Sequence, residues 1–292
     1  MRRTQAVFQQ PANALLETEI NDAVRRALAE DIGSGDLTAA LIPESAVAEA
    51  RVISREAAIL CGTAWFDAVF HELSRPVEIN WRVRDGEYTT AGQTVCTLRG
   101  AARALLTGER TALNFLQTLS GTATVARRYA DAVRGTGVQV LDTRKTLPGL
   151  RHAQKYAVRC GGCHNHRMGL YDGVLIKENH IRAAGSITAA LCAVQDIAAD
   201  VVLIEIEVRT VEELREALAA GAKRILLDNF TLDDLRRAVA EKHGCAKLEA
   251  SGGITLENIR LVAETGVDFI SVGDMTKNVQ AVDLSLLFDM RP

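Results

Sequence analysis

The segment from Leu141 to His180 gathers side chains that bind small anions. Its cations are Arg144, Lys145, Arg151, Lys155, Arg159, Arg167 and Lys177, joined by His164 and His166, against the carboxylates Asp142, Asp172 and Glu178. The whole chain has a formal net charge of −3, so this is a local positive field in a slightly acidic protein. Such a field suits a small ligand with several negative charges better than a long polyanion, which needs a broad basic surface.

A group of carboxylates follows further along the chain. Glu205 and Glu207 alternate within an apolar run and therefore share one face of a predicted strand. Together with Asp228, at the end of the next run, they could hold Mg²⁺ or stabilise a developing carbocation. Ion pairing with the lysines and arginines opposite is the alternative, and the two roles do not exclude each other.

Two glycine turns are typical of a phosphate site. Ser251-Gly252-Gly253 precedes a predicted helix, and Ser271-Val272-Gly273 ends the last apolar run. Glycine lets the backbone approach a phosphate, which accepts hydrogen bonds from N–H groups at a helix N-terminus. Either turn alone fits an ordinary connection, but a pair after the last two strands matches the common phosphate site of α/β barrels.

The motif Cys160-Gly-Gly-Cys163, with His164 and His166 after it, resembles a metal or thiol redox site. The sequence has no second C-x-x-C, and the two glycines favour a tight turn, which is the interpretation we adopt. The six cysteines are scattered in a chain too long to need disulfides, which favours a reducing compartment.

Length and composition limit the class of protein. The chain has 292 residues, 48% of them hydrophobic, which is enough to bury a sizeable core in two domains. Its net charge disfavours nucleic acid as a partner. The N-terminus lacks the apolar segment of a signal peptide, and no apolar run reaches the roughly 18–20 residues that span a bilayer. We expect a cytoplasmic protein that binds neither nucleic acid nor membrane.

From about residue 138 onward, short apolar runs alternate with amphipathic stretches, which predicts a parallel sheet with helices packed on it. The predicted strands are 138–142, 172–177, 201–208, 224–229, 247–252 and 268–273. Thr210 and Thr231 begin predicted helices, and Gly221 and Gly266 end them. Polar or glycine residues end all six strands, where barrels gather their catalytic groups. We expect a barrel-like α/β domain short of eight strands.

The first hundred residues have the pattern of an α+β domain. The predicted elements are a helix at 18–33, half-buried antiparallel strands within 48–62, 76–88 and 92–100, and a helix at 102–119. The expected domains are 1–120 and 121–276, with 277–292 packing back on the first.

Several motifs in a fixed order resemble the quinolinate phosphoribosyltransferase family. They are GERTALNFLQTLSGTAT, LDTRKTLPGLR, NHRMGLYDGVLIKENHI, EIEV, LLDNF, SGGI, SVG and TKNVQAVDLSLLF, so the likeness covers nearly the whole chain. The resemblance implies a type II phosphoribosyltransferase with an N-terminal α/β sandwich and a C-terminal open α/β barrel of about six strands. It also implies homodimers with shared active sites, with higher assembly left open.

The activity implied by the resemblance is phosphoribosyl transfer from 5-phosphoribosyl-1-pyrophosphate (PRPP) to quinolinate. With Mg²⁺ as cofactor, the products would be nicotinate mononucleotide, pyrophosphate and CO₂, a step of de novo NAD biosynthesis. Both substrates carry several negative charges, which fits the cationic segment, because arginine binds a carboxylate with two parallel hydrogen bonds.

Matching motifs give single residues a role. The quinolinate set would be Arg144, His166, Arg167 and Lys177, with Thr143 also binding substrate and Lys145 contacting both substrates. The 5-phosphate set would be Ser251, Gly252, Gly253, Val272 and Gly273. Glu207 and Asp228 would lie near the ribose and Mg²⁺ and, with Lys145, form the catalytic set. Arg110 would reach into the neighbouring subunit's site.

Other activities stay open at this stage. A nicotinate phosphoribosyltransferase would handle one carboxylate and release no CO₂, whereas Arg110, Arg144 and Lys177 favour a diacid. A paralogue associated with molybdate transport would share the architecture. A barrel isomerase or aldolase would use Lys177 as a Schiff-base lysine. A non-enzymatic binding module is disfavoured by the convergence of polar strand ends.

Cys163 departs from the family pattern, because members commonly have glycine there. A Cβ atom would strain the loop if φ were positive at this position. We expect Cys163 to have negative φ and the loop to keep its path, with no metal on Cys160 and Cys163.

Overall fold

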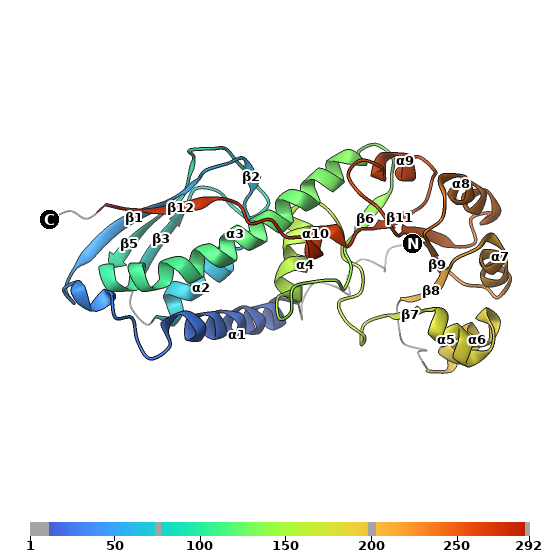
Figure 1. Ribbon diagram of the computed structural model, residues 1–292, viewed down its shortest axis with the longest axis horizontal. Helices are drawn as coiled ribbons and strands as arrows, with labels where there is room; N and C mark the ends of the chain where they lie inside the picture. Colours follow the sequence, from blue (N-terminus) through green and yellow to red (C-terminus); the bar gives the residue numbers. More distant parts are fainter. Residues whose placement is uncertain (1–11, 74–76, 198–202, 290–292) are drawn as a thin grey trace, which may run out of the picture. The chain divides into compact units, whose positions relative to one another are not determined.

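The computed structural model describes residues 12–73, 77–197 and 203–289. The chain folds into two compact units, which Figure 1 colours along the sequence. Unit 1 comprises Met1–Thr124, Pro148–Gly161 and Val279–Pro292, and unit 2 comprises Val125–Leu147 and Gly162–Asn278. Both units are therefore discontinuous in sequence.

A four-stranded antiparallel sheet with the order β12-β1-β5-β3 forms the centre of unit 1. Its strands are β1 (Val47–Ser54), β3 (Val77–Trp81), β5 (Thr94–Ala101) and β12 (Leu284–Asp289), and a separate pair joins β2 (Ala58–Ile59) to β4 (Tyr88–Thr89). Exposed and buried residues alternate along the first part of β1, as the sequence pattern predicts for a sheet covered on one face.

Helices cover one face of this sheet. They are α1 (Ala12–Ile32), α2 (Thr63–Glu72) and the first part of α3 (Ala102–Ala132), with a 3₁₀ turn, η1 (Ala39–Leu41), between α1 and β1. Trp65 and Phe66 of α2 are almost completely buried and share one apolar cluster with Val52 of β1 and Leu105 of α3. Each such side chain stabilises the unit by roughly 1.5–3 kcal/mol relative to an exposed position.

Helix α3 is longer than the helix predicted at 102–119. It continues because Ala123, Ala126 and Tyr129 prolong its buried face. A Cβ atom at Gly121, within the helix, would come within 2.1 Å of the carbonyl oxygen of Gln280. Glycine here therefore lets the C-terminal segment run directly against the helix before β12 pairs with β1.

Helix α4 (Arg151–Cys160) belongs to unit 1, whereas the expected division at residues 120 and 121 places it in the barrel. Its Ala157 joins the apolar core of unit 1, and Tyr156 Oη donates a hydrogen bond to Asp85 Oδ2 at 2.8 Å. Amphipathic spacing predicts that a helix face is buried but does not identify what buries it. The cationic segment is thus divided, because the cations on α4 lie in unit 1, with Lys155 fully buried.

A six-stranded parallel sheet with the order β6-β11-β10-β9-β8-β7 forms the centre of unit 2. Its strands are β6 (Gln139–Leu141), β7 (Val174–Ile176), β8 (Ile204–Val208), β9 (Arg224–Asp228), β10 (Lys247–Ser251) and β11 (Phe269–Ser271). All six predicted strands are confirmed, although residues 201 and 202 of the third lie outside the described ranges. Because β6 and β7 stand at opposite edges, the sheet is open, as expected for an open α/β barrel.

The helices of unit 2 follow its strands along the chain. They are α5 (Glu178–Ala184), α6 (Ile187–Ile197), α7 (Val211–Ala219), α8 (Leu232–Glu241), α9 (Ile259–Ala263) and α10 (Asp274–Lys277). Thr210 and Thr231 cap α7 and α8 by accepting hydrogen bonds from the backbone N–H groups of Glu213 and Asp234, as predicted. Among the described residues, the helices are too short or too polar to cross a membrane.

Candidate functional site

A cavity of about 360 Å³ lies at the carboxyl ends of the unit 2 strands. The expected site residues that line it are Thr143, Arg144, Lys145, His166, Arg167, Lys177, Glu207, Asp228 and Ser251. Ser271, which begins the second glycine turn, also lines the cavity, and three residues that sequence reasoning did not select complete the lining, namely Leu175, Leu226 and Glu249. The sheet thus brings the cations and the carboxylates predicted separately into one cavity.

One part of the cavity wall is cationic. Arg167 is half-buried, and its Nη1 donates a hydrogen bond to the carbonyl oxygen of Gly173 at 2.8 Å. Burial and the charge of Arg144 lower the pKa of Arg167, so the two guanidinium groups are close enough to repel each other. A bound carboxylate would relieve this repulsion and accept hydrogen bonds from both groups.

The carboxylates on the wall already have cationic partners. Lys177 Nζ lies 2.6 Å from Glu207 Oε2, and Arg209 Nε lies 3.8 Å from Asp228 Oδ2. We call these two the wall pairs. The ion pairs that the sequence left as an alternative are therefore present, and Lys177, Glu207 and Asp228 still line the cavity. The Lys177 side chain is 50% exposed, so water or a substrate can replace its partner.

Asp142 positions the loop that carries His166. It is fully buried and accepts hydrogen bonds from Asn165 Nδ2 at 2.5 Å and from the His166 backbone N–H at 2.9 Å. The backbone N–H of Asp142 donates to the carbonyl oxygen of His164. Sequence reasoning counted Asp142 only as a counter-charge, whereas here it holds the loop against the end of β6.

Both ring nitrogens of His166 are engaged within the protein. Its Nδ1 accepts a hydrogen bond from the Arg167 backbone N–H at 2.7 Å, which leaves the ring proton on Nε2. Nε2 lies 2.8 Å from Glu205 Oε2 and donates to it. His166 therefore lines the cavity, but in this structure it orients neighbours and does not offer a nitrogen to quinolinate.

A buried charged layer adjoins the wall, and two of its members, His166 and Glu249, also line the cavity. We call it the lower layer; it consists of His166, Glu205, Arg224 and Glu249. Arg224 bridges the two carboxylates, with Nε 3.0 Å from Glu205 Oε1 and Nη2 2.5 Å from Glu249 Oε2. Its guanidinium carbon also lies 4.1 Å from the ring centre of Phe269, a cation–π contact.

The two carboxylates of the lower layer titrate in opposite directions. Burial alone would raise the pKa of Glu205, but the hydrogen bond from His166 and the charge of Arg224 outweigh it and lower that pKa. Burial and the Glu205 charge raise the pKa of Glu249 to about 7. Its Oε1 is buried without a hydrogen-bond partner. His166, Glu205 and Glu249 are close enough to share a metal ion, yet Arg224 already neutralises them.

The first glycine turn has the backbone that the sequence predicts. Gly252 has φ +96°, and a Cβ atom there would lie 2.2 Å from Asn229 Oδ1. Asn229, itself at φ +58°, donates its backbone N–H to the Ser251 carbonyl oxygen at 2.8 Å. These contacts join the ends of β9 and β10. Gly253 follows Gly252 in the turn and has φ +61°.

The second turn differs from expectation at Val272. This residue is buried, and its backbone N–H donates to the Leu141 carbonyl oxygen at 2.9 Å. The sheet thus occupies this N–H group, and the phosphate-binding role expected for Val272 stays a prediction. Gly273 caps α10 and lies beside Thr143 and Lys145.

Arg110 lies in unit 1, where it is exposed on α3 between buried residues. Its expected role concerns a neighbouring subunit and stays a prediction. The negative φ predicted for Cys163 is confirmed, because Cys163 is not among the described residues with positive φ. Its Sγ donates to the Ala126 carbonyl oxygen at 3.1 Å.

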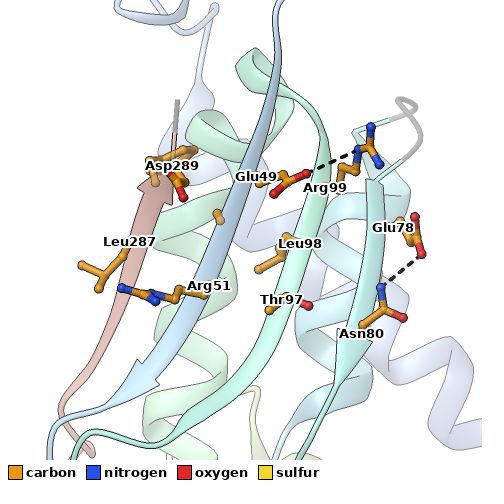
Figure 2. A pocket seen from close by; sticks show the side chains of 11 residues that line it. Glu49, Arg51, Glu78, Asn80, Thr97, Leu98, Arg99, Leu287 and Asp289 are labelled. Carbon is orange, nitrogen blue, oxygen red and sulfur yellow. Dashed lines mark hydrogen bonds and ion pairs between the residues drawn. The ribbon is translucent and has the colours of Figure 1, made fainter. Parts of the chain in front are cut away.

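A second hollow, of about 540 Å³, lies on the uncovered face of the unit 1 sheet. Leu98 among its lining residues belongs to the buried core, whereas Figure 2 shows the polar side chains on the face of the sheet away from the helices. They pair among themselves, since Arg99 Nε lies 3.8 Å from Glu49 Oε1 and Asn80 Nδ2 donates to Glu78 Oε1. None of its lining residues belongs to the expected site, so the chemistry is assigned to the cavity of unit 2.

The lower layer could have been found from strand periodicity. Glu205 lies two residues before Glu207, and Glu249 lies two residues before Ser251. Arg224 lies four residues before Asp228. Side chains at such spacing share a face of the sheet. Sequence reasoning used this spacing for Glu205 and Glu207 but did not extend it to Arg224 and Glu249.

Two family models match the chain. The model of the quinolinate phosphoribosyl transferase N-terminal domain matches residues 36–120, and that of the C-terminal domain matches residues 122–287. The probable nicotinate-nucleotide pyrophosphorylase (carboxylating) of Bacillus subtilis is 44% identical over 257 residues, which cover 88% of this chain and 89% of that protein. The nicotinate-nucleotide pyrophosphorylase (carboxylating) of Mycobacterium leprae is 44% identical over 272 residues, covering 91% and 95%.

Solved structures agree with these matches. The nicotinate-nucleotide pyrophosphorylase from Francisella tularensis has a TM-score of 0.91 and 45% identity, covering 94% of this chain and 97% of that chain. Human nicotinic acid phosphoribosyltransferase, at 13% identity and a TM-score of 0.61, covers 93% of this chain and 73% of that chain, and it shows only a shared fold. Since both domain models match in order, this chain belongs to the quinolinate phosphoribosyltransferase family.

Proposed function

We propose that this protein transfers the phosphoribosyl group of PRPP to quinolinate, with release of pyrophosphate and CO₂, to give nicotinate mononucleotide for NAD biosynthesis. The observation that carries the proposal is the cavity of unit 2, where a cationic wall, the carboxylates of Glu207 and Asp228, and Ser251 at the start of a glycine turn face one space. Family membership supports the same reaction.

Quinolinate would bind the cationic wall through its two carboxylates. Arg144 and Arg167 form one subsite, and Lys177, which lines the same cavity, forms a second. A carboxylate at Lys177 replaces Glu207 as its partner and frees Glu207 to face the ribose. Quinolinate binding thereby prepares the charge that the second substrate needs.

In the transfer step, the quinolinate nitrogen bonds to ribose C1 as the bond from C1 to pyrophosphate breaks. Positive charge develops on the ribose, and Glu207 and Asp228 stabilise it from the wall. The carboxylate at C2 then leaves as CO₂, because the positively charged ring nitrogen stabilises the electron pair left at C2. Thr143 and Lys145 hold the two substrates in alignment for the transfer.

Mg²⁺ fits the oxygen ligands present. It takes one or two carboxylates and completes its coordination with water and substrate phosphates. Glu207 and Asp228 offer two carboxylates on the wall, and the glycine turn at Ser251-Gly252-Gly253 receives the 5-phosphate. When bound, the ion supplies positive charge that neutralises the departing pyrophosphate.

The aldolase alternative fits the wall less well. A Schiff-base lysine reacts as a neutral amine, which requires a desolvated pocket or a second cation beside it. Lys177 is half exposed and pairs with Glu207 at 2.6 Å, which favours its charged form. Borohydride treatment with substrate is therefore expected to trap no adduct.

Arg110 supports a shared site in a homodimer, because it is an exposed cation close to the buried Gly108 and Thr111 on the same helix. Mixed Arg110→Ala and Lys145→Ala subunits are expected to regain activity that neither variant has. Lack of recovery despite subunit exchange would contradict sharing. The described cysteines are free thiols, which agrees with a cytosolic enzyme.

The test is turnover by purified protein with PRPP, Mg²⁺ and either quinolinate or nicotinate. We expect kcat/KM for quinolinate to exceed that for nicotinate by on the order of 10³-fold, because the monoacid leaves cations on the wall without a partner. Equal use of both acids would favour the nicotinate enzyme. Folded protein with no turnover would favour the molybdate-associated paralogue.

A further inference from the structure

Two cysteines far apart in sequence meet inside unit 1. Cys61 lies just before α2, and Cys160 is the last residue of α4. Their sulfur atoms and a carboxylate oxygen of Asp85 all lie within 4.8 Å of one another. Oxidation could join the sulfurs after a small movement, since sulfur atoms in a disulfide are about 2 Å apart.

The two thiols have unequal surroundings. Cys61 is fully buried, and burial raises its pKa. Cys160 is partly exposed. The hydrogen bond from Cys61 lowers the pKa of Cys160 and the charge of Arg159 adds to this, while burial and the Asp85 charge act in the opposite direction. One thiol is thus accessible with a stabilised thiolate, and its neighbour is protected, which is the arrangement of an attacking and a resolving cysteine.

A metal site is the competing interpretation, and the partners of Asp85 disfavour it. Asp85 Oδ1 accepts the backbone N–H groups of Gly62 and Thr63, each at 3.1 Å. Oδ2 accepts the Tyr156 hydroxyl at 2.8 Å. A cation would have to displace these hydrogen bonds, which hold the start of α2 and the face of α4 together.

The C-x-x-C motif supplies the other competing pair, but its second thiol has a partner of its own. Cys163 Sγ donates to the Ala126 carbonyl oxygen at 3.1 Å. Burial raises the pKa of Cys163 to about 12, which keeps its thiol protonated and unreactive. Cys61 is therefore the better partner for Cys160.

We propose that Cys160 is a site of oxidation by hydrogen peroxide and that Cys61 converts the oxidised form into a disulfide. The Cys160 thiolate attacks one peroxide oxygen, the O–O bond breaks, and the second oxygen leaves as water after taking a proton. Cys61 then attacks the sulfur of the sulfenic acid, forming the S–S bond, and its proton leaves with the hydroxyl group as a second water. The two sulfurs together lose two electrons, which the peroxide accepts.

The test uses the full-length protein, treated briefly with hydrogen peroxide and then alkylated, digested without reductant and analysed by mass spectrometry. We expect a linked pair of peptides containing Cys61 and Cys160, and the loss of both thiols from alkylation. The exposed Cys192 and Cys245 should stay alkylatable at the same dose. The Cys163→Ser protein is the matched control and should form the same bond.

Variants separate the two roles. Cys61→Ala should stop oxidation at the sulfenic acid, so that dimedone labels Cys160. Cys160→Ala should leave Cys61 reduced. A bond between Cys160 and Cys163, or oxidation of Cys192 and Cys245 while Cys160 stays reduced, would overturn the proposal. The disulfide pattern of the wild-type protein can by itself support or overturn the proposal. The test therefore does not depend on whether the variants fold.

Discussion

The wall pairs and the lower layer of unit 2 are both built from opposite charges, but they differ in access to water. Lys177 in the wall is 50% exposed, whereas Glu205 and Glu249 below it are 0% exposed and Arg224 is 17% exposed. A half-exposed pair gains little free energy and can exchange its partner, while breaking a buried pair strands a charge. The wall is therefore suited to bind substrates, and the lower layer to hold the barrel beneath them.

The largest expected effect tests the lower layer. Arg224→Met should lower the free energy of unfolding by about 3–5 kcal/mol, because it leaves Glu205 and Glu249 buried together without their shared cation. Urea unfolding followed by circular dichroism measures the change. Arg215→Met is the matched control, since Arg215 also binds a glutamate, Glu241, but on the exposed surface. Similar losses in both variants would remove the distinction between the two layers.

An intermediate effect tests the wall. Lys177→Ala should reduce kcat/KM for quinolinate by about 10–150-fold, the value of a charged hydrogen bond to a carboxylate, with little change in stability. Steady-state kinetics with unfolding curves measures both. Lys247→Ala, which removes an exposed lysine paired with Asp268 outside the cavity, is the control. A Lys177→Ala protein that unfolds readily would show that this pair is structural instead.

The smallest expected effect is a pH dependence of stability that comes from Glu249 in the lower layer. Burial raises the pKa of Glu249 from its ordinary 4.5 to about 7. Between these pH values Glu249 is ionised in the unfolded chain but protonated in the folded protein. Glu249 therefore lowers the free energy of unfolding as pH rises from about 4.5 to 7. Glu249→Gln lacks this loss and should match the wild type at pH 5 but exceed it at pH 8 by on the order of 1 kcal/mol. A difference independent of pH would contradict a raised pKa at this position.

The sequence predicted the wall better than what lies under it, for a physical reason. Lys177, Glu207 and Asp228 stand at strand ends, where a polar residue breaks an apolar run and is easily recognised. Glu205 and Glu249 stand inside strands, where only knowledge of the inner face reveals that they are buried together.

The fold was predictable to a similar degree. Six strands and the caps at Thr210 and Thr231 follow from local patterns, so they were found. Assignment of α4 to unit 1 depends on contacts such as Tyr156 with Asp85, which join distant parts of the chain. The hydrogen bond from the Val272 backbone N–H to β6, a strand more than a hundred residues earlier, depends on distant parts of the chain in the same way.

The central claim is that the unit 2 cavity joins quinolinate to ribose and removes one carboxylate. Quinolinate labelled with ¹⁴C in the C2 carboxyl group tests it directly, in the presence of PRPP and Mg²⁺. The account predicts one labelled CO₂ for each pyrophosphate released, and loss of both products in Asp228→Ala. Pyrophosphate released while the label stays in the nucleotide, or labelled CO₂ formed without PRPP, would contradict it.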